Sequence, residues 1–255
     1  MSRNKFLPHT VLVTGAGSGI GAALAVALHG RGCHVIITGP TEDKLVALAR
    51  QHAGMAYEVL NVANADAVAR CAASMAQRHP SLDCVINSAG VQRLVDFSVD
   101  IDEVSEVTRE IDINLIGTAN IAMAFLPQLR RQPTATLVLV GSALGYTPLI
   151  SAPLYSAAKA GVHAFAICLR RQLRGQSVNV VEIIPPVVET GLHRDQGQRP
   201  PRAMPLDRFT TAVLAGLDSR QPEITVGLAR VLQIGSKIAP PLFLRIVNKD
   251  RAASN

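Results

Sequence analysis

The chain has 255 residues, of which 48% are hydrophobic and 17% charged, and its formal net charge is +6. A chain of this length and composition can bury a large core, which excludes extensive disorder and makes one α/β domain the expectation. Aromatic residues make up only 4%, no block of lysine or arginine is continuous, and no nucleic-acid-binding motif is present, so we expect no nucleic-acid partner.

The targeting and cysteine patterns point to a cytoplasmic protein. The first ten residues contain no apolar stretch typical of a secretory signal, and no uncharged apolar run approaches the roughly 18 residues of a transmembrane helix. The four cysteines, Cys33, Cys71, Cys84 and Cys168, lie far apart. Because this spacing indicates neither a zinc site nor a disulfide framework, we expect buried, reduced thiols.

Apolar, β-branched runs alternate with helical patterns along the chain. The runs, each typical of a strand buried on both faces, cover residues 10–14, 34–38, 57–62, 82–88, 135–141 and 178–184. The helical patterns cover residues 19–31, 41–52, 64–78, 103–131 and 154–174. Helix and strand signals resume near 206 and 222, after a segment rich in proline, glycine and arginine.

This order predicts a three-layer, doubly wound Rossmann fold with a central parallel sheet of about seven strands, formed by residues 1–255 as a single domain. In such a sheet, ligands bind beyond the carboxyl ends of the strands. The long loop at about 186–206 is expected to cover a substrate. Its Arg194, Arg199 and Arg202 could meet an anionic group, although arginines in such a loop are commonly only solvated.

A glycine-rich turn follows the first predicted strand. The segment TGAGSGIG, residues 14–21, contains Gly15, Gly19 and Gly21 and leads directly into a helical run. Glycine lets the backbone turn tightly and approach a pyrophosphate, and the helix that follows favours an anion at its start. A turn of this kind between the first strand and the first helix predicts a dinucleotide site.

The end of the second strand bears on the choice of cofactor. An Asp or Glu here would bond the ribose 2′-hydroxyl of NAD, but the sequence reads Thr38-Gly39-Pro40-Thr41. The carboxylate is missing, and so is the arginine that usually pairs with a 2′-phosphate, which leaves Thr41 and Lys44 as the nearby candidates. The pattern favours NADP over NAD and leaves both open.

Tyr155 and Lys159 begin the helix after the fifth strand, and a spacing of four places them on one helical face. A free tyrosine has a pKa of about 10, so proton transfer near neutral pH requires a nearby cation, which Lys159 can supply. Ser142 lies at the end of the preceding strand. Its hydroxyl could reach the carbonyl oxygen of a substrate to which Tyr155 gives its proton.

Five short motifs occur in order along residues 10–190, namely TGAGSGIG, NSAG at 87–90, NLIG around Asn114, Ser142, and YSAAK from Tyr155. Together they resemble the short-chain dehydrogenase/reductase family. The chain departs from the commonest pattern at Asn61, where Asp is frequent, and at Pro185-Pro186, where Pro-Gly is usual. The second departure makes PPVVETGL similar to oxidoreductases found in the D-alanyl-lipoteichoic acid operon.

The resemblance implies an NAD(P)-dependent oxidoreductase that interconverts a small-molecule alcohol and a carbonyl by hydride transfer. Tyr155 would be the general acid/base, Ser142 would position the substrate oxygen, Lys159 would bind the nicotinamide ribose and lower the pKa of the tyrosine, and Asn114 would hold a relay water. The residues expected at the cofactor are Gly15, Gly17, Ser18, Gly19, Ile20, Gly21, Gly39, Asn61, Val62, Asn87, Ala89, Gly90, Tyr155, Lys159, Pro185, Val188 and Thr190.

Other chemistries fit the sequence less well. A serine hydrolase would need glycine two residues before Ser142, where Val140 stands. The seven histidines form no H-E-x-x-H motif, so no metal site is expected. A non-catalytic dinucleotide-binding regulator or scaffold stays open as the alternative, because a dinucleotide fold does not establish turnover.

Two surfaces suggest partners. The resemblance implies a homodimer or homotetramer, and the helices at 103–131 and 154–174 offer an outer apolar stripe that includes Ile121, Phe125, Ala164 and Cys168. From residue 220 onward there are six basic residues and two acidic ones, and the apolar run from Leu242 to Val247 lies among them. This C-terminus could lie on a membrane surface, although closing the substrate pocket or an interface is the preferred interpretation.

Overall fold

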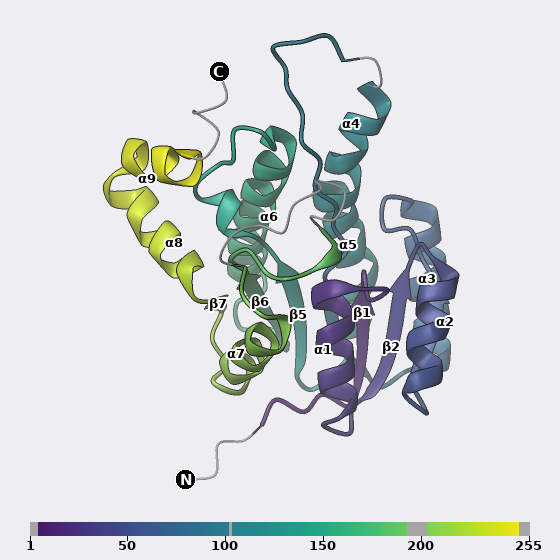
Figure 1. Ribbon diagram of the computed structural model, residues 1–255. Helices are drawn as coiled ribbons and strands as arrows, with labels where there is room; N and C mark the ends of the chain where they lie inside the picture. Colours follow the sequence, from purple (N-terminus) through teal and green to yellow (C-terminus); the bar gives the residue numbers. More distant parts are fainter. Residues whose placement is uncertain (1–4, 102–103, 193–202, 250–255) are drawn as a thin grey trace.

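A seven-stranded parallel sheet runs through the part of the chain that the computed structural model describes, residues 5–101, 104–192 and 203–249 (Figure 1). Its strand order is β3-β2-β1-β4-β5-β6-β7. The strands are β1 (Thr10–Thr14), β2 (His34–Gly39), β3 (Ala56–Val59), β4 (Leu82–Asn87), β5 (Ala135–Val140), β6 (Val178–Ile184) and β7 (Glu223–Thr225). The order reverses between β1 and β4, where a doubly wound sheet opens a crevice for ligands. The predicted Rossmann fold is confirmed.

Helices cover both faces of this sheet and complete the three layers (Figure 1). They are α1 (Gly19–His29), α2 (Glu42–Gln51), α3 (Ala65–Arg78), α4 (Val104–Ile111), α5 (Gly117–Leu129), α6 (Pro153–Gln172), α7 (Leu206–Asp218), α8 (Leu228–Ile238) and α9 (Pro240–Val247). Short π and 3-10 helices, η1 (Asp112–Ile116) and η2 (Ala143–Gly145), precede α5 and α6. Helices α3, α5 and α6 pack on one face, and α1, α2 and α7 pack on the other.

Successive residues of β1 show why the strand runs are continuously apolar. Leu12 packs into the cluster with α3 and α5, while Val11 and Val13 pack into the cluster with α1 and α7. The edge strand β3 differs, because Tyr57 and Val59 are 41% and 48% exposed. Our prediction of a strand at 57–62 buried on both faces was therefore wrong in its bounds and in its burial, since an edge strand has a neighbour on one side alone.

The helix predicted over 103–131 is interrupted. Residues 112–116 form a π-helix, in which the Gly117 N–H donates to the carbonyl of Asp112 five residues back. Ile121 and Phe125, expected on an outer stripe, are fully buried because this side of α5 faces the sheet and α3. Their assignment to a subunit interface was wrong.

The other two stripe residues, Ala164 and Cys168 on α6, are exposed. The exposed Cys168 also corrects the expectation of four buried thiols, which holds for Cys33, Cys71 and Cys84. All four are free cysteines. The helical pattern in the sequence shows which residues are apolar. The packing of the helix in the fold decides which of these residues face outward.

Two helices that the sequence patterns did not predict, α8 and α9, lie beside α6 at the β7 edge of the sheet (Figure 1). Within the described ranges, no helix is both long and apolar enough to cross a membrane. The three loop arginines, Arg194, Arg199 and Arg202, lie outside the described residues, as does most of the loop predicted at 186–206.

Candidate active site

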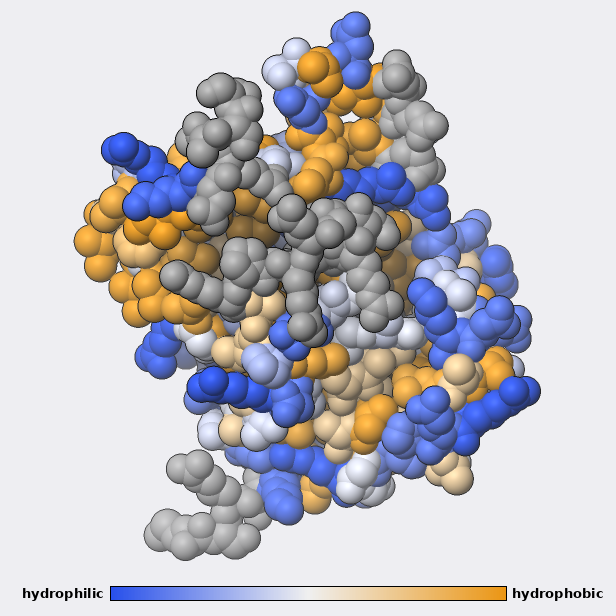
Figure 2. Space-filling view, in the orientation of Figure 1, coloured by the Kyte–Doolittle hydropathy of each residue, from blue (hydrophilic) through white to orange (hydrophobic). Residues whose placement is uncertain are grey.

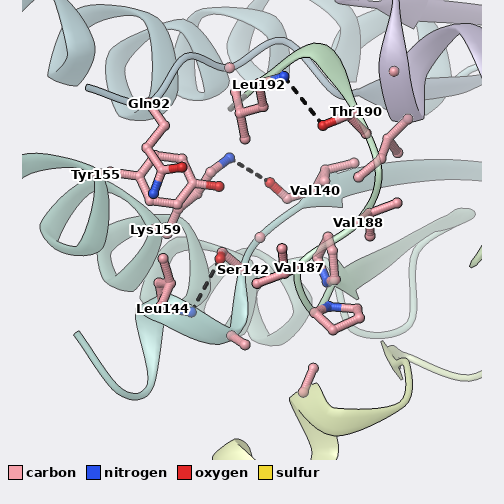
Figure 3. Close-up of a pocket in the computed structure, with 18 of the residues that line it drawn as sticks. Gln92, Val140, Ser142, Leu144, Tyr155, Lys159, Val187, Val188, Thr190 and Leu192 are labelled. Carbon is pink, nitrogen blue, oxygen red and sulfur yellow. Dashed lines mark hydrogen bonds between the residues drawn. The ribbon is translucent and has the colours of Figure 1, made fainter. Parts of the chain in front are cut away.

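Tyr155 and Lys159 stand one turn apart on the inward face of α6 (Figure 3). The helix starts at Pro153, whose fixed backbone angle suits the first turn. Tyr155 is 7% and Lys159 is 5% exposed. The Lys159 ammonium donates to the carbonyl oxygen of Val140 at 2.8 Å and lies 5.6 Å from the centre of the Tyr155 ring. The end of β5 therefore holds the lysine directly beside the tyrosine.

Ser142 follows β5 and completes a group of three polar side chains. Its Oγ accepts a hydrogen bond from the Leu144 N–H at 3.1 Å, which starts the 3-10 turn η2, and the Ser142 side chain lies close enough to Tyr155 to act on the pKa of its hydroxyl. A Cβ on Gly145 would come within 2.9 Å of the backbone of Lys159, so glycine is needed for η2 to pack against α6. This close approach brings the serine to the tyrosine.

Asn114 lies beneath the site, fully buried within η1. Its side chain accepts from the Val91 N–H at 3.2 Å and donates to the Val91 carbonyl at 2.8 Å. Thr118 Oγ1 donates to the carbonyl of Asn114 and accepts from Asn87, which in turn accepts from Thr14. This chain of bonds ties the ends of β1 and β4 to the π-helix and fixes the loop after β4.

The predicted glycine turn lies between β1 and α1 and opens toward the same edge of the sheet. Gly15 and Gly19 have φ values of +64° and +58°. A Cβ on Gly15 would stand 2.6 Å from the Ala89 Cα, and a Cβ on Gly21 would stand 2.6 Å from the Gly15 carbonyl oxygen. Because side chains would fill this space, the three glycines form a cradle of bare backbone at the start of a helix.

One cavity of about 1450 Å³ joins the glycine turn to Tyr155 (Figure 3). Of the predicted site residues, those on its wall are Gly15, Ser18, Gly19, Ile20, Gly21, Gly90, Ser142, Tyr155, Lys159, Pro185, Val188 and Thr190. The others, at the same edge of the sheet but off this wall, are Gly17, Gly39, Asn61, Val62, Asn87, Ala89 and Asn114. The structure thus brings together the two ends of the site that the sequence suggested separately.

The family model for short chain dehydrogenases matches residues 9–201 of the chain. The chain belongs to the short-chain dehydrogenase/reductase family. The resemblance inferred from the five motifs is therefore confirmed, and the protein is an enzyme of this family.

This short-chain dehydrogenase is similar to several named proteins. It is 34% identical to the oxidoreductase DltE of Bacillus subtilis over 224 residues, which cover 87% of this chain and 89% of the relative. A short-chain dehydrogenase of Burkholderia cenocepacia, solved in complex with NADP, is 25% identical, with a TM-score of 0.83 over 96% of this chain and 99% of that one. One from Sphingobium yanoikuyae in complex with NADPH is 26% identical, with a TM-score of 0.77 over 91% and 95%. The predicted similarity to the D-alanyl-lipoteichoic acid operon oxidoreductase is confirmed.

Burial dominates the electrostatics of this short-chain dehydrogenase site. It raises the pKa of Tyr155 to about 12, against the lowering effect of the hydrogen bond from Ser142. The sequence led us to expect a pKa lowered by Lys159, whereas burial and the nearby carboxylate of Glu110 raise it. Burial also lowers the pKa of Lys159 to about 8, while the carboxylates of Glu182 and Glu110 act to raise it. The tyrosine is a neutral acid at pH 7.

Sequence reasoning missed these two carboxylates and a histidine that pairs with one of them. Glu182, on β6, is fully buried, and its Oε2 lies 2.7 Å from Nδ1 of His163 on α6. Tyr146 Oη lies 3.0 Å from the same nitrogen. The signal was a glutamate within a mostly apolar and buried strand, since a buried carboxylate requires a partner.

The pair continues into a polar cluster at the edge of the sheet. Atoms of His163, Glu182 and Glu223 that could bind a metal all lie within 4.8 Å of one another. Arg170 and Gln233, however, both donate to Glu223, at 3.2 and 3.1 Å. Because the protein's own donors already bond that carboxylate, we interpret the cluster as an ion-pair network that joins α6, β6, β7 and α8.

This network predicts a pH dependence of stability. The hydrogen bond to Glu182 raises the pKa of His163 above its ordinary value, against the effect of burial. A raised histidine pKa contributes stability that is complete below the unfolded value of about 6.5 and is lost as pH rises through the folded value. We expect His163→Gln to lower the free energy of unfolding by about 1–2 kcal/mol at pH 5.5 and by less at pH 8.5.

Urea titrations at both pH values measure this difference. The half-buried His52 serves as a matched control, because it makes no ion pair among the described residues, and His52→Gln should change stability equally at both pH values. A His163→Gln effect that grows with pH would contradict the assignment of a charged histidine.

Proposed function

We propose that this enzyme interconverts an alcohol and a carbonyl by hydride transfer with NADP(H) or NAD(H), and that Tyr155 is the general acid/base. One observation carries the proposal: Ser142, Tyr155 and Lys159 meet on the wall of a cavity whose other end is the glycine turn. A proton donor and a dinucleotide cradle in one cavity are the two parts that this reaction needs.

Each side chain has a separate task in the reductive direction. The Tyr155 hydroxyl donates its proton to the substrate oxygen as negative charge develops there, and the Ser142 hydroxyl donates a hydrogen bond to the same oxygen. The Lys159 ammonium, held by Val140, stabilises the phenolate that remains. The bound nicotinamide supplies or accepts the hydride. Asn114 acts by holding the loop after β4, and a water bound near it would return the proton to Tyr155.

The residues present fit a dinucleotide. The cradle at Gly15, Gly19 and Gly21 has no room for a Cβ at its first and third positions, and it places bare N–H groups at the start of α1 for a pyrophosphate. The Ala16 N–H donates to the carbonyl of Thr38 at 3.0 Å, which holds the turn against the end of β2. Thr190, in the segment after β6, lies against Gly19 and would contact the side of the dinucleotide that faces away from β2.

Lys44 favours NADP(H) as the cofactor. Its Cβ lies 3.3 Å from the point where a Cβ on Gly17 would stand, so this exposed lysine rises from α2 directly beside the glycine turn. Gly39 and Pro40 occupy the end of β2, so no carboxylate stands there to bond the ribose 2′-hydroxyl of NAD. The relatives solved with NADP and NADPH agree with this preference. NAD(H) remains the alternative.

We expect Lys44→Gln to raise the dissociation constant for NADPH about tenfold and to leave that for NADH nearly unchanged, because one lysine–phosphate contact contributes about 1.5 kcal/mol. Arg50→Gln is the matched control, since Arg50 is an exposed cation in the last turn of the same helix. Calorimetric titration with both cofactors measures the change. Equal weakening of NADPH and NADH would contradict the assignment of Lys44 to the 2′-phosphate.

The wall beyond Tyr155 is mostly apolar and points to a substrate with an apolar body. Its side chains include Val91, Leu94, Val95, Leu144, Val187 and Leu192. Such walls orient a small molecule through shape, while few polar groups fix the reacting atom. We propose that the loop at 186–206 covers this substrate, that residues 1–255 act as one Rossmann-type domain, and that the enzyme works as a homodimer or homotetramer.

The experiment that tests the proposed function is turnover with a panel of aldehydes, ketones and alcohols, followed through the absorbance of NADPH and NADH. We expect turnover with at least one apolar carbonyl compound. Tight binding of a cofactor without turnover of any compound would favour the alternative, a non-catalytic dinucleotide-binding regulator or scaffold.

A further inference from the structure

The helices α8 and α9 expose more large apolar side chains than a solvated surface requires. Ile238 is 78% exposed, more than any other large apolar side chain among the described residues. The exposed apolar residues of the two helices are Leu228, Val231, Ile234, Ile238, Leu242, Leu244 and Ile246. Figure 2 shows apolar surface gathered on the left of the view, where Figure 1 places α8 and α9. We name these seven residues the α8–α9 face. Contiguous apolar surface of this kind marks an interaction site.

The α8–α9 face is formed by two regular helices that pack on each other. Val231, Ile234 and Ile238 recur at helical spacing along the exposed side of α8, where Val231 also borders the cavity, while Ala229 packs inward. Helix α9 has no buried residue. The ring of Phe243 packs so closely on Gly235 that a Cβ there would overlap it. The two helices therefore form a hairpin held by its inner contacts, with the apolar side chains left outside.

The charges around the face all have one sign. Residues 224–249 contain four basic residues, Arg230, Lys237, Arg245 and Lys249, and no acidic residue. None of the four makes an ion pair with a described carboxylate. Arg230 and Lys237 are seven residues apart, so they lie on one side of α8, next to the apolar stripe. Long cationic side chains in this position can extend toward anionic groups while their stems stay on apolar surface.

These charges discriminate between two possible partners. A second copy of the chain would bind through an isologous interface, which would bring the same four cations opposite one another with no carboxylate between them. Such like-charge pairing opposes association. An anionic bilayer instead offers acyl chains to the apolar stripe and phosphate groups to the cations beside it.

We propose that the α8–α9 face docks on the surface of an anionic lipid bilayer. The two short helices lie in the interface, and their apolar side chains enter the boundary between headgroups and acyl chains. Leu228, Val231, Phe243 and Ile246 also line the cavity that contains Tyr155. Docking therefore places one wall of the cavity at the membrane surface.

The chain contains no tryptophan, which allows a single reporter to be introduced. Ile238→Trp places it on the face, and Val59→Trp places a matched control on the exposed edge strand β3, at the opposite edge of the sheet. The probes are vesicles of equal parts phosphatidylglycerol and phosphatidylcholine, and vesicles of phosphatidylcholine alone. We expect a blue shift of the Ile238→Trp emission with the anionic vesicles, and none with neutral vesicles or with Val59→Trp.

Flotation of the unmodified chain with the same vesicles tests the proposal without a reporter. Lys237→Gln combined with Arg245→Gln should lower the partition coefficient on the order of 30-fold, since each cation near an anionic surface contributes about 1 kcal/mol. Ile234→Ser combined with Ile238→Ser should abolish flotation. All four positions are exposed, and thermal unfolding of the variants verifies that they fold.

Three results would overturn the proposal. The first is no flotation with anionic vesicles, and the second is equal binding to neutral vesicles. The third is light scattering that shows an oligomer of the unmodified chain that Ile234→Ser with Ile238→Ser dissociates, because the face would then be a subunit interface. None of these measurements depends on turnover, so the proposed reaction and the docking surface can fail separately.

Discussion

Replacing Tyr155 by phenylalanine is expected to lower kcat/KM about a thousandfold while the dissociation constant for NADPH changes little. The ring that fills the site is kept, and the hydroxyl that donates the proton is lost. General acid catalysis by a positioned side chain contributes about 10²- to 10⁴-fold. Burial raises the pKa of Tyr155 to about 12, so its hydroxyl carries the proton at neutral pH. Steady-state rates and calorimetric titration of the two proteins measure both quantities.

Tyr146→Phe is the matched control for this experiment. Tyr146 is also partly buried, and its hydroxyl is hydrogen-bonded to Gln233, but it does not lie on the wall of the cavity. We expect its kcat/KM to stay within about threefold of the unmodified enzyme, less than 1 kcal/mol in transition-state stabilisation. Activity that survives the loss of the Tyr155 hydroxyl would remove the proposed acid/base role.

Gly15→Ala is expected to raise the dissociation constant for NADPH at least about a hundredfold, equivalent to about 3 kcal/mol. The added Cβ would stand 2.6 Å from the Ala89 Cα and 2.7 Å from its nitrogen, and both are backbone atoms that cannot rotate away. The turn must therefore move away from the end of β4 and carry its N–H groups with it. Titration with NADPH measures the loss of binding.

Gly32→Ala separates this clash from the cost of an unusual backbone angle. Gly32 has a φ of +91°, and an added Cβ there would meet nothing within 4 Å. An alanine at Gly32 should therefore cost about 1 kcal/mol of stability through strain alone and leave NADPH binding intact. If Gly15→Ala and Gly32→Ala bind NADPH equally well, the glycine turn is not the cofactor cradle.

The parts that the sequence predicted are those in which local pattern and function coincide. Strands buried on both faces leave continuous apolar runs, as in β1 between its two helical layers. The glycine turn is visible because its backbone angles exclude other residues, and Tyr155 and Lys159 are visible because four residues make one helical turn. Each of these signals lies within a few residues of chain.

The parts that it missed depend on contacts between distant segments. The glutamate in β6 signals that a partner exists, but its pairing with His163 requires α6 to lie on β6. The sequence pattern predicted Ile121 and Phe125 on an outer stripe, but α5 packs with both side chains in the core. Helix α9 was also missed, although its two prolines stand in the first turn, where proline suits a helix.

Because η1 is a π-helix, the position of Asn114 depends on the number of residues in this short stretch. In an α-helix each residue turns the chain by about 100°, and a π-turn accommodates one residue more than an α-turn does. Loss of a single residue between 112 and 116 would let this stretch close into a regular α-helix and rotate α4 relative to α5. Asn114 would then leave the Val91 backbone, although every side chain involved was still present. An insertion or deletion in this stretch would therefore displace Asn114.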